Sequence, residues 1–388
     1  MMLQSSKNGV ALMLVLVALI FLSLISFEFM YASRVDLKIS ANARNRLQAW
    51  YLAQSASRIS LLRLYLYQKV IEMKQNGQPI PVESNVIDQI WSFPLPGFPF
   101  PGQVFGKDHR LPGEVSSVIK PEGSLIPINL LDGNKNRSSS KKIAEDILEQ
   151  CRQLFTSEVE NNEEFDKLYR GLRFEDLFDP LVDWIDANND RKDGGGDEST
   201  EYERKDPPYR PRNDRIPVIS ELHMIQGWND DLYKRFSPQF SVLKSDLAIN
   251  PNHIPLIRLK SFHPPLSPED LKAIEERRRD QPFKDLKEMA TYIQTSSDVR
   301  NGQGFKFPDK LKSSTTESIF KIEAIGIVGQ AKRKLELGIR LSELDDKNKK
   351  PGNNPEASAP TSETDKSKAT QKEIKFGPPE VVSFEVVL

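Results

Sequence analysis

The chain begins with one long segment in which no residue interrupts a helix. From Val10 to Asn76 the sequence contains neither glycine nor proline, and its first 18 positions, Val10–Phe27, carry no charge. A run of that length is close to the shortest that spans a hydrocarbon core of about 30 Å. Gly77 and Pro79 then end the helical pattern. The pattern predicts a single helix that starts in a bilayer and continues far beyond it.

Beyond the membrane run, apolar residues recur at intervals of three and four, which is the stripe of an amphipathic helix. The stripe consists of Ala49, Leu52, Ala56, Ile59, Leu62, Leu66, Val70 and Met73. At 1.5 Å per residue the whole rod would be about 100 Å long. A cleaved secretory signal is one alternative, but small residues should then follow a shorter apolar run, and Glu28-Phe29-Met30-Tyr31 follows instead. An ordinary single-pass anchor is the simpler alternative.

The charges that flank the apolar run disagree with an exported head. Arg34, Lys38, Arg44 and Arg46 follow the run, whereas Lys7 is the one charge before it. Positive charge normally gathers on the cytoplasmic side of a membrane. Taken alone, this rule would place the soluble part of the chain in the cytoplasm.

The residues before the apolar run favour export. Lys7-Asn8-Gly9 followed at once by an apolar helix resembles the class III leader of type IV pilins and type II secretion pseudopilins. The resemblance implies that a prepilin peptidase cuts after Gly9 and leaves Val10 as the mature N-terminus. It also implies an exported head, because the family tolerates a positive flank after the membrane run.

Leu14 occupies the fifth position counted from Val10, where most pilins carry a glutamate. A carboxylate inside the bilayer is costly, and the family keeps it to pair with the N-terminal ammonium of a neighbouring subunit. A subunit with nothing stacked above it has no ammonium to neutralise. Leu14 therefore suits a subunit at the tip of a filament.

The remaining pattern predicts strands on both sides of a helical region. Val115–Ile119 and Leu125–Asn129 flank the turn signal Pro121-Glu122-Gly123, which favours a hairpin. Later strands are expected at Ile319–Ile327 and Lys334–Leu341, about a turn at Gly329, and at Val381–Val387. The expected helices are Ile143–Leu154, Asp166–Leu177, Leu181–Ala187, Leu271–Arg279 and Asp285–Ile293.

Motifs in the helical region narrow the resemblance. The string Asp179-Pro180-Leu181-Val182-Asp183-Trp184-Ile185-Asp186 is similar to a motif of the general secretion pathway protein K family, the K-type minor pseudopilins. Further similar strings occur in the family's order at Ile128–Leu130, Asp206–Arg210, Ser220–Leu222, Phe320–Ala324 and Arg333–Leu335. The chain departs from the family in the glycine-rich stretch Asp193–Asp197 and in the tail after Leu341.

The expected fold class is therefore α+β. A long N-terminal transmembrane and amphipathic helix packs on a small antiparallel, pilin-like sheet, and a large α-helical domain is inserted into the sheet. The expected divisions are a leader (1–9), the helix (10–78), strands (79–133), the helical insert (134–314), strands (315–341), a linker (342–373) and a final strand (374–388). The linker has no aromatic and few apolar residues, so we expect it to be disordered.

Charge and motif content give no signal of nucleic-acid binding or catalysis in the sequence. The formal net charge of −1 gives no electrostatic reason to expect nucleic acid. The single cysteine, Cys151, lies on the apolar face of an expected helix and is expected in the core. The four histidines show no metal-binding spacing, and no catalytic motif appears in its required context.

Acidic residues crowd one region of the expected helical insert, between Asp183 and Asp206. Oxygen ligands at short spacing suit Ca²⁺, which takes six to eight of them from a flexible loop. The spacing of Asp186, Asn188 and Asp190 matches the start of an EF-hand, but Arg191 stands where that loop requires glycine. We therefore predict a non-standard calcium loop, with candidate ligands Asp183, Asp186, Asn188, Asp190, Asp197, Glu198 and Asp206.

The resemblance supports calcium, because K-type pseudopilins bind it in their helical domain. A solvated acidic loop, partly neutralised by Arg191, Lys192, Arg204 and Lys205, is the alternative. The stretch from Ile249 to Ile293 is similar to a helix-hairpin-helix element of the same family. Such elements contact DNA phosphates elsewhere through glycine-rich hairpins, but Phe262–Leu266 has no glycine, so we expect a packing module.

The resemblance implies a minor pseudopilin at the tip of the type II secretion pseudopilus, which initiates assembly and aids protein export across the outer membrane. Its implied partners are the I-type and J-type minor pseudopilins, the major pseudopilin and the prepilin peptidase. The chain would sit in the inner membrane with its head in the periplasm and would bind no nucleic acid. The alternatives are a minor pilin of a type IV pilus or competence system, and a membrane-tethered, metal-dependent periplasmic enzyme.

Overall fold

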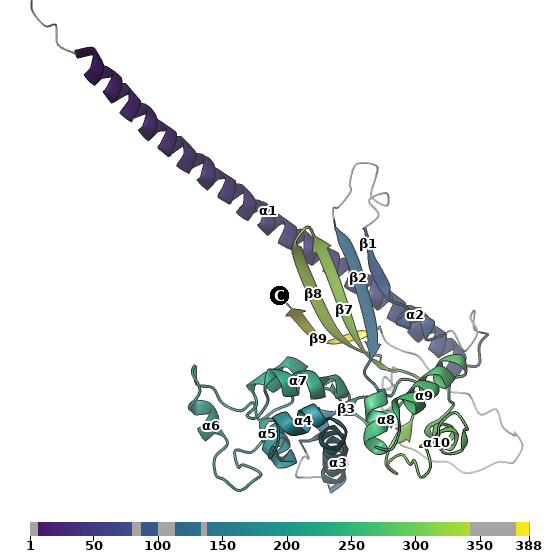
Figure 1. Cartoon of the computed structure of the whole chain (residues 1–388). Helices are drawn as coiled ribbons and strands as arrows, with labels where there is room; N and C mark the ends of the chain where they lie inside the picture. The colour runs from purple at the N-terminus through teal and green to yellow at the C-terminus, as the bar shows by residue number, and fades with distance from the viewer. Residues whose placement is uncertain (1–6, 80–86, 100–112, 133–137, 342–377, 388) are drawn as a thin grey trace, which may run out of the picture.

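One helix forms the spine of the molecule (Figure 1). The computed structural model describes residues 7–79, 87–99, 113–132, 138–341 and 378–387. Helix α1 runs unbroken over 69 residues, Lys7–Gln75, and ends just before Gly77, whose φ of +67° suits a helix terminus. It contains a stretch long and apolar enough to cross a membrane, and none of that stretch is buried in the protein. The single continuous helix predicted from the sequence is confirmed.

An antiparallel sheet of five strands packs on the second half of α1 (Figure 1). Its strands lie in the order β1, β2, β7, β8, β9. They are β1 (Leu95–Pro99), β2 (Glu114–Pro121), β7 (Ile319–Val328), β8 (Ala331–Arg340) and β9 (Glu380–Val387). The short helix α2 (Gln89–Ser92) lies beside α1. The α+β class and the predicted strands after residue 318 are confirmed.

Small residues allow α1 to approach the sheet closely. Ala49 and Ala53 are fully buried and lie over Gly326 of β7. A Cβ atom on Gly326 would lie 2.1 Å from the carbonyl oxygen of Ala49 and 2.6 Å from the amide nitrogen of Ala53. Glycine is therefore required at this position for α1 to dock at its observed distance.

The chain leaves the sheet after β2 and returns at β7, and the residues between form a helical insert below the sheet (Figure 1). Its first part contains α3 (Ser138–Asn161), α4 (Glu163–Leu168), α5 (Phe174–Ile185), α6 (Ser199–Glu203) and α7 (Asp230–Phe236), with 3₁₀ turns at Ile128–Leu130, Ile219–Met224 and Ser237–Gln239. Its second part contains α8 (Leu256–Phe262), α9 (Pro268–Asp280) and α10 (Leu286–Thr295). Two pairs of short parallel strands each bring together the two ends of one part: β3 (Ile126–Pro127) with β4 (Phe240–Ser241) for the first, and β5 (Ala248–Ile249) with β6 (Lys312–Ser313) for the second.

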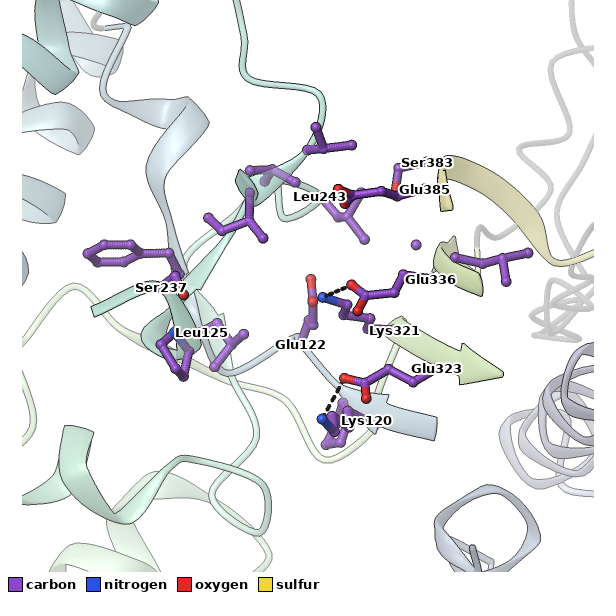
Figure 2. A pocket seen from close by; sticks show the side chains of 18 of the residues that line it. Lys120, Glu122, Leu125, Ser237, Leu243, Lys321, Glu323, Glu336, Ser383 and Glu385 are labelled. Atoms are coloured by element: carbon purple, nitrogen blue, oxygen red, sulfur yellow. Dashed lines mark hydrogen bonds and ion pairs between the residues drawn. The ribbon is translucent and has the colours of Figure 1, made fainter. Parts of the chain in front are cut away.

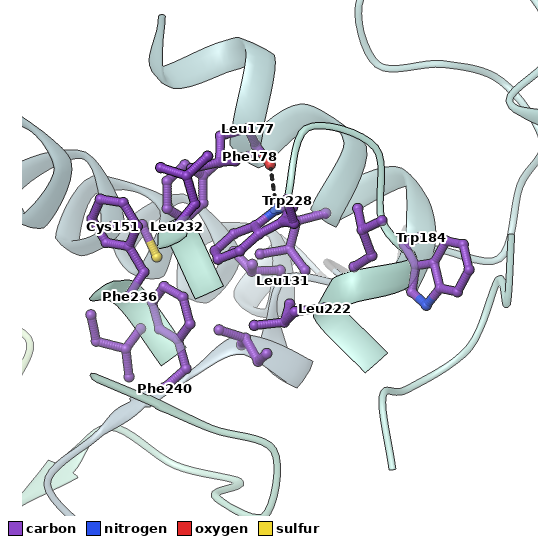
Figure 3. Close-up of a cluster of buried hydrophobic side chains, with 14 of the residues drawn as sticks. Leu131, Cys151, Leu177, Phe178, Trp184, Leu222, Trp228, Leu232, Phe236 and Phe240 are labelled. Atoms are coloured by element: carbon purple, nitrogen blue, oxygen red, sulfur yellow. Dashed lines mark hydrogen bonds between the residues drawn. The ribbon is translucent and has the colours of Figure 1, made fainter. Parts of the chain in front are cut away.

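The first part of the insert has an aromatic core (Figure 3). Phe178 packs edge-on against Trp228, Phe236 and Phe240, and the indole N–H of Trp228 donates to the carbonyl of Leu177 at 3.0 Å. Cys151 is fully buried in this core, as the sequence predicted, and burial raises the pKa of its thiol to about 12. The second part has its own core around Ile274, Met289 and Phe305, so the stretch Ile249–Ile293 packs as a separate module.

Two local predictions are wrong. β2 does not form a hairpin with Leu125–Asn129, because it pairs with β7 instead. Ile126 and Ile128 are buried in the core of the insert. The helices expected at Asp166–Leu177 and Leu181–Ala187 are divided differently. Gly171, at φ +95°, breaks the first, and α5 continues through Pro180, which the sequence interpretation treated as a boundary. The linker predicted at 342–373 lies outside the described residues.

Candidate metal centre

Three carboxylates meet where α5 ends and α6 begins. Asp183 lies in the last turn of α5, Asp186 follows its last residue, and Glu198 immediately precedes α6. One carboxylate oxygen from each lies within 4.8 Å of the others. Asp183 and Glu198 are buried, at 7% and 3% exposure, and Asp186 is half-buried. The structure thus forms a compact acidic triad from residues up to 15 positions apart.

The loop between Asp186 and Glu198 is folded by its own polar side chains. The Asp186 carboxylate accepts from the backbone N–H of Asn188 at 3.1 Å, and the Asn188 side chain in turn accepts from the N–H of Asp190 at 2.8 Å. Asp190 and Asp197 then form an isolated antiparallel bridge. The N–H of Glu198 donates to the carbonyl of Asn189 at 3.1 Å, which closes the loop and aims Glu198 back at α5.

Two members of the triad have few compensating donors among the described residues. Asp183 accepts a hydrogen bond from the backbone N–H of Lys192 at 3.0 Å. Both carboxylate oxygens of Glu198 are buried, and neither has a hydrogen-bond partner within the part of the chain that the structure describes. Burial and the neighbouring charge of Asp183 raise the pKa of Glu198 to about 8, and burial raises the pKa of Asp183 to about 6. A buried carboxylate without a partner is costly, and this triad could hold a cation that offsets the cost.

The donor set fits a hard divalent cation. Carboxylate and carbonyl oxygens are what Ca²⁺ prefers, and they suit Zn²⁺ poorly without nitrogen or sulfur. A cavity of about 430 Å³ adjoins the triad and is lined by Asp183 and Glu198 together with Asp179, Asp193 and Glu201. Asp179 is paired with Lys192 at 2.9 Å and Asp193 with Arg191 at 2.6 Å. The negative charge in this cavity that lacks an ion-pair partner among the described residues therefore lies at Asp183 and Glu198.

The structure brings together three of the seven residues proposed from the sequence: Asp183, Asp186 and Glu198. Asn188 hydrogen-bonds to Asp186, and Asp190 and Asp197 lie on the same loop with exposed side chains. Asp206 is exposed and outside the triad. The ligand role of all seven remains a prediction.

A second cavity, of about 440 Å³, lies between the sheet and the insert (Figure 2). Its charges are largely internally paired. Lys120 contacts Glu323 at 2.5 Å, and Lys321 contacts Glu336 at 2.5 Å. Ser241 donates to Glu122 at 2.9 Å. This cavity is therefore a polar contact between the sheet and the insert, and the described residues that line it form no cluster of acidic side chains like the triad.

Sequence reasoning missed a set of buried charges at the junction of sheet and insert. The Lys244 ammonium donates to the carbonyls of Gly123 and Ala248, and the Arg258 guanidinium donates to the carbonyl of Ser124. The Glu317 carboxylate is buried directly against the backbone of Gly123. Lys244, Arg258 and Glu317 are each at most 2% exposed. They are isolated in the sequence, so no spacing signal could have revealed them.

Comparison with known proteins gives a consistent result. A sequence model of the family described as "Type II secretion system (T2SS), protein K" matches residues 129–245, which include the triad. The type II secretion system protein K of Pseudomonas aeruginosa is 24% identical over 249 residues, which is 64% of this chain and 66% of that protein. Its counterpart from Pectobacterium carotovorum is 28% identical over 163 residues, which is 41% of this chain and 47% of that protein. The chain thus aligns with about two thirds and about half of the lengths of these relatives.

A solved structure shares the fold. The crystal structure of the GspK-GspI-GspJ complex from the type 2 secretion system of enterotoxigenic Escherichia coli contains a chain that superposes with a TM-score of 0.51. The superposition covers 79% of this chain and 93% of that chain, at 17% sequence identity. The architecture of a long helix, a sheet and a helical insert is therefore shared with a solved protein.

Proposed function

The chain belongs to the type II secretion system protein K family, and on that premise we propose that it is the tip subunit of the pseudopilus. The family consists of secretion-system components and is not an enzyme family. The tethered enzyme considered from the sequence is therefore set aside. In the proposed role the chain initiates assembly and aids protein export across the outer membrane, and it acts through its surfaces rather than through catalysis.

The observation that carries this proposal is the division of α1 into two halves. The half from Leu12 to Met30 exposes nearly every apolar side chain, as a membrane segment must. The other half packs on the sheet through Ala49, Ala53 and Ala56. This helix suits insertion in the inner membrane with the sheet and insert held in the periplasm.

The outer face of α1 supports assembly with similar subunits. Opposite the sheet, α1 exposes Leu47, Tyr51, Leu62, Tyr65 and Leu66. Exposed apolar residues at helical spacing on a soluble segment mark a surface that another helix covers. The Escherichia coli relative was crystallised with GspI and GspJ, and we infer that the I-type and J-type subunits, with the major pseudopilin below them, are the partners here.

The tip position is supported by Leu14, which is apolar and 65% exposed. A filament subunit below the tip needs a carboxylate at this height to pair with the ammonium of the subunit above it. Leu14 offers no such charge, so addition of subunits would proceed only beneath this chain. The competence and type IV pilus alternatives are less well supported, because the family match is to a secretion component.

Calcium is part of the proposal. Asp183, Asp186 and Glu198 would hold the ion, with oxygens of the loop between them as further donors. When bound, Ca²⁺ supplies positive charge that neutralises the three carboxylates. These residues would then fix the loop to the end of α5 and stabilise the first part of the insert.

The processing step gives the most direct test of the proposed function. The full chain is expressed with and without a prepilin peptidase, and its mature N-terminus is sequenced. A mature chain that begins at Val10 only when the peptidase is present is the expected result. An intact Met1 in both cases, or a cut near residue 30, would overturn the pseudopilin role.

A further inference from the structure

The outermost strand of the sheet, β9, presents two different faces. Ser383 and Glu385 point toward the insert and line the cavity in Figure 2, where Ser220 donates to Glu385 at 2.9 Å. The other face carries Val381, Phe384 and Val386, which pair across the strand with Ile339, Leu337 and Leu335 of β8. Those three β8 residues are buried beneath α1. Cross-strand partners share a face, so the apolar face of β9 is on the side of α1.

The apolar face of β9 remains largely uncovered. Ile339, Leu337 and Leu335 are 0–5% exposed, but their β9 partners Val381, Phe384 and Val386 are 46%, 52% and 39% exposed. Helix α1 covers β7, β8 and β2 and reaches β9 through an edge-on contact of Trp50 with Phe384, at 6.3 Å between ring centroids. The sheet therefore extends past α1 and leaves an exposed apolar strip beside this helix, which we call the β9 groove: Trp50, Val381, Phe384 and Val386.

The membrane-proximal end of the β9 groove is positively charged. Asn45 lies at the β7–β8 turn, beside Gly329, which places Arg46 next to that turn. Arg333 of β8 lies on the same face as Ala331 and Leu335, both of which pack toward α1. It directly precedes Lys334, which pairs with Val387, the last described residue of β9. Neither Arg46 nor Arg333 has an ion-pair partner within the described parts of the chain.

These features together specify the occupant. The exposed apolar surface of β9 is a face of the sheet. A further strand that paired with the edge of β9 would extend this face and would not cover it. A helix lying beside α1 would cover it, because neighbouring helices on a sheet lie about 10 Å apart. A second copy of this chain at the same height would bring Arg46 against Arg46 and Arg333, so like charges disfavour it.

We propose that the β9 groove receives the amphipathic helix of another pilin-like subunit, which runs parallel to α1 and carries a carboxylate one to two turns before the apolar residues that meet Phe384. The carboxylate would pair with Arg46 and Arg333. The parallel direction rests on the proposed function, because helices that enter the same membrane with exported heads point the same way.

The test is photo-crosslinking of the full chain in membranes that contain the whole secretion system. A photoreactive phenylalanine analogue replaces Phe384 in one variant and Leu62, on the outer face of α1, in another. Phe384 is expected to crosslink to a helical peptide of a different pilin-like subunit. Arg333→Glu should reduce that product about fivefold, as reversal of exposed charge pairs allows. Lys332→Glu, the neighbouring residue on the opposite face of β8, should leave it unchanged and serves as the matched control.

The outcomes separate the two proposals. A Leu62 crosslink to a partner without a Phe384 crosslink overturns the β9 groove and leaves the pseudopilin role intact. Products at Phe384 that join it to a strand of another subunit, or to a second copy of this chain, also overturn it. If neither position crosslinks while the chain is inserted in the membrane, the assembly role itself is wrong. The Phe384 crosslink that Arg333→Glu weakens should return when the facing carboxylate of the partner helix is replaced by a basic residue. That result would support the predicted parallel direction.

Discussion

Glu198→Gln is expected to stabilise the calcium-free protein and to remove most of its response to calcium. Glutamine keeps the size of the buried side chain but removes one of three carboxylates that lie within 4.8 Å of one another. Its amide N–H groups can donate to Asp183 and Asp186, whereas the oxygens of Glu198 accept no hydrogen bond from any described residue. The substitution therefore relieves repulsion in the calcium-free protein and removes a ligand from the calcium-bound one.

The size of the effect follows from the spacing. Two unit charges about 5 Å apart repel by roughly 3 kcal/mol at an effective dielectric constant of about 20. Glu198 faces two such charges, but partial protonation and solvent reduce the cost, so we expect a gain of about 1–3 kcal/mol in the calcium-free protein. Calcium at about 100 times its dissociation constant should stabilise the unaltered protein by about 2.7 kcal/mol. Most of that gain should be absent in the variant.

Calorimetric melting of the full chain in detergent, with a chelator and then with excess calcium, measures both effects. The two-part signature is a higher melting temperature in chelator and a smaller calcium shift. Glu203→Gln is the matched control, because Glu203 is the same residue type nearby, exposed and paired with Arg210 at 3.1 Å. The reasoning fails if Glu198→Gln lowers stability in chelator and keeps the full calcium shift.

Three further outcomes are expected. Gly326→Ala should lower the free energy of unfolding by about 1–3 kcal/mol, because its Cβ would lie 2.1 Å from the Ala49 carbonyl oxygen; denaturant melts that match those of the unaltered chain would contradict this. Burial raises the pKa of Glu317 to about 7 and lowers that of Lys244 to about 7, so their joint contribution should fall as pH rises from about 4.5 to 7 and recover from about 7 to 10.5. Glu317→Gln combined with Lys244→Met should flatten that part of the stability profile, and an unchanged profile would exclude the pair as its source. Leu14→Glu should cost about 2.5–3.5 kcal/mol of membrane insertion, seen as less chain in the membrane fraction; undiminished insertion would show that the new charge finds a partner.

The sequence predicted those elements whose signal is local. Helix α1 contains no glycine or proline after Gly9. In β7 and β8, on either side of Gly329, apolar and polar residues alternate. These elements could therefore be predicted directly from the sequence. The hairpin was wrong because the partner of β2 is β7, about 200 residues later, and short-range turn signals cannot show such a pairing. The break at Gly171 was missed because one glycine within a helical pattern is often tolerated.

The candidate site was predictable in region but not in detail. The nine acidic residues from Asp183 to Asp206 indicated a cation site, yet only the closure of the loop by Asn188, Asp190 and Asp197 decides which of them face inward. Glu198 faces inward because its N–H is held by Asn189. The β9 groove was not visible at all, because it depends on how far the sheet extends past α1.

The placement of the insert provides an argument for the tip role that is independent of Leu14. The insert lies at the end of the sheet farthest from the membrane half of α1 (Figure 1). The Glu122–Ser124 segment connects it to β2, and Lys244 and Arg258 hold this segment by donating hydrogen bonds to its carbonyls. A subunit stacked above this chain would have to occupy the space that the insert fills. Within the described residues, the outer face of α1 and the β9 groove are exposed, and α1 continues from them toward its membrane half. Partners can therefore approach from the side and from below, which is the geometry that a subunit at the end of a filament requires.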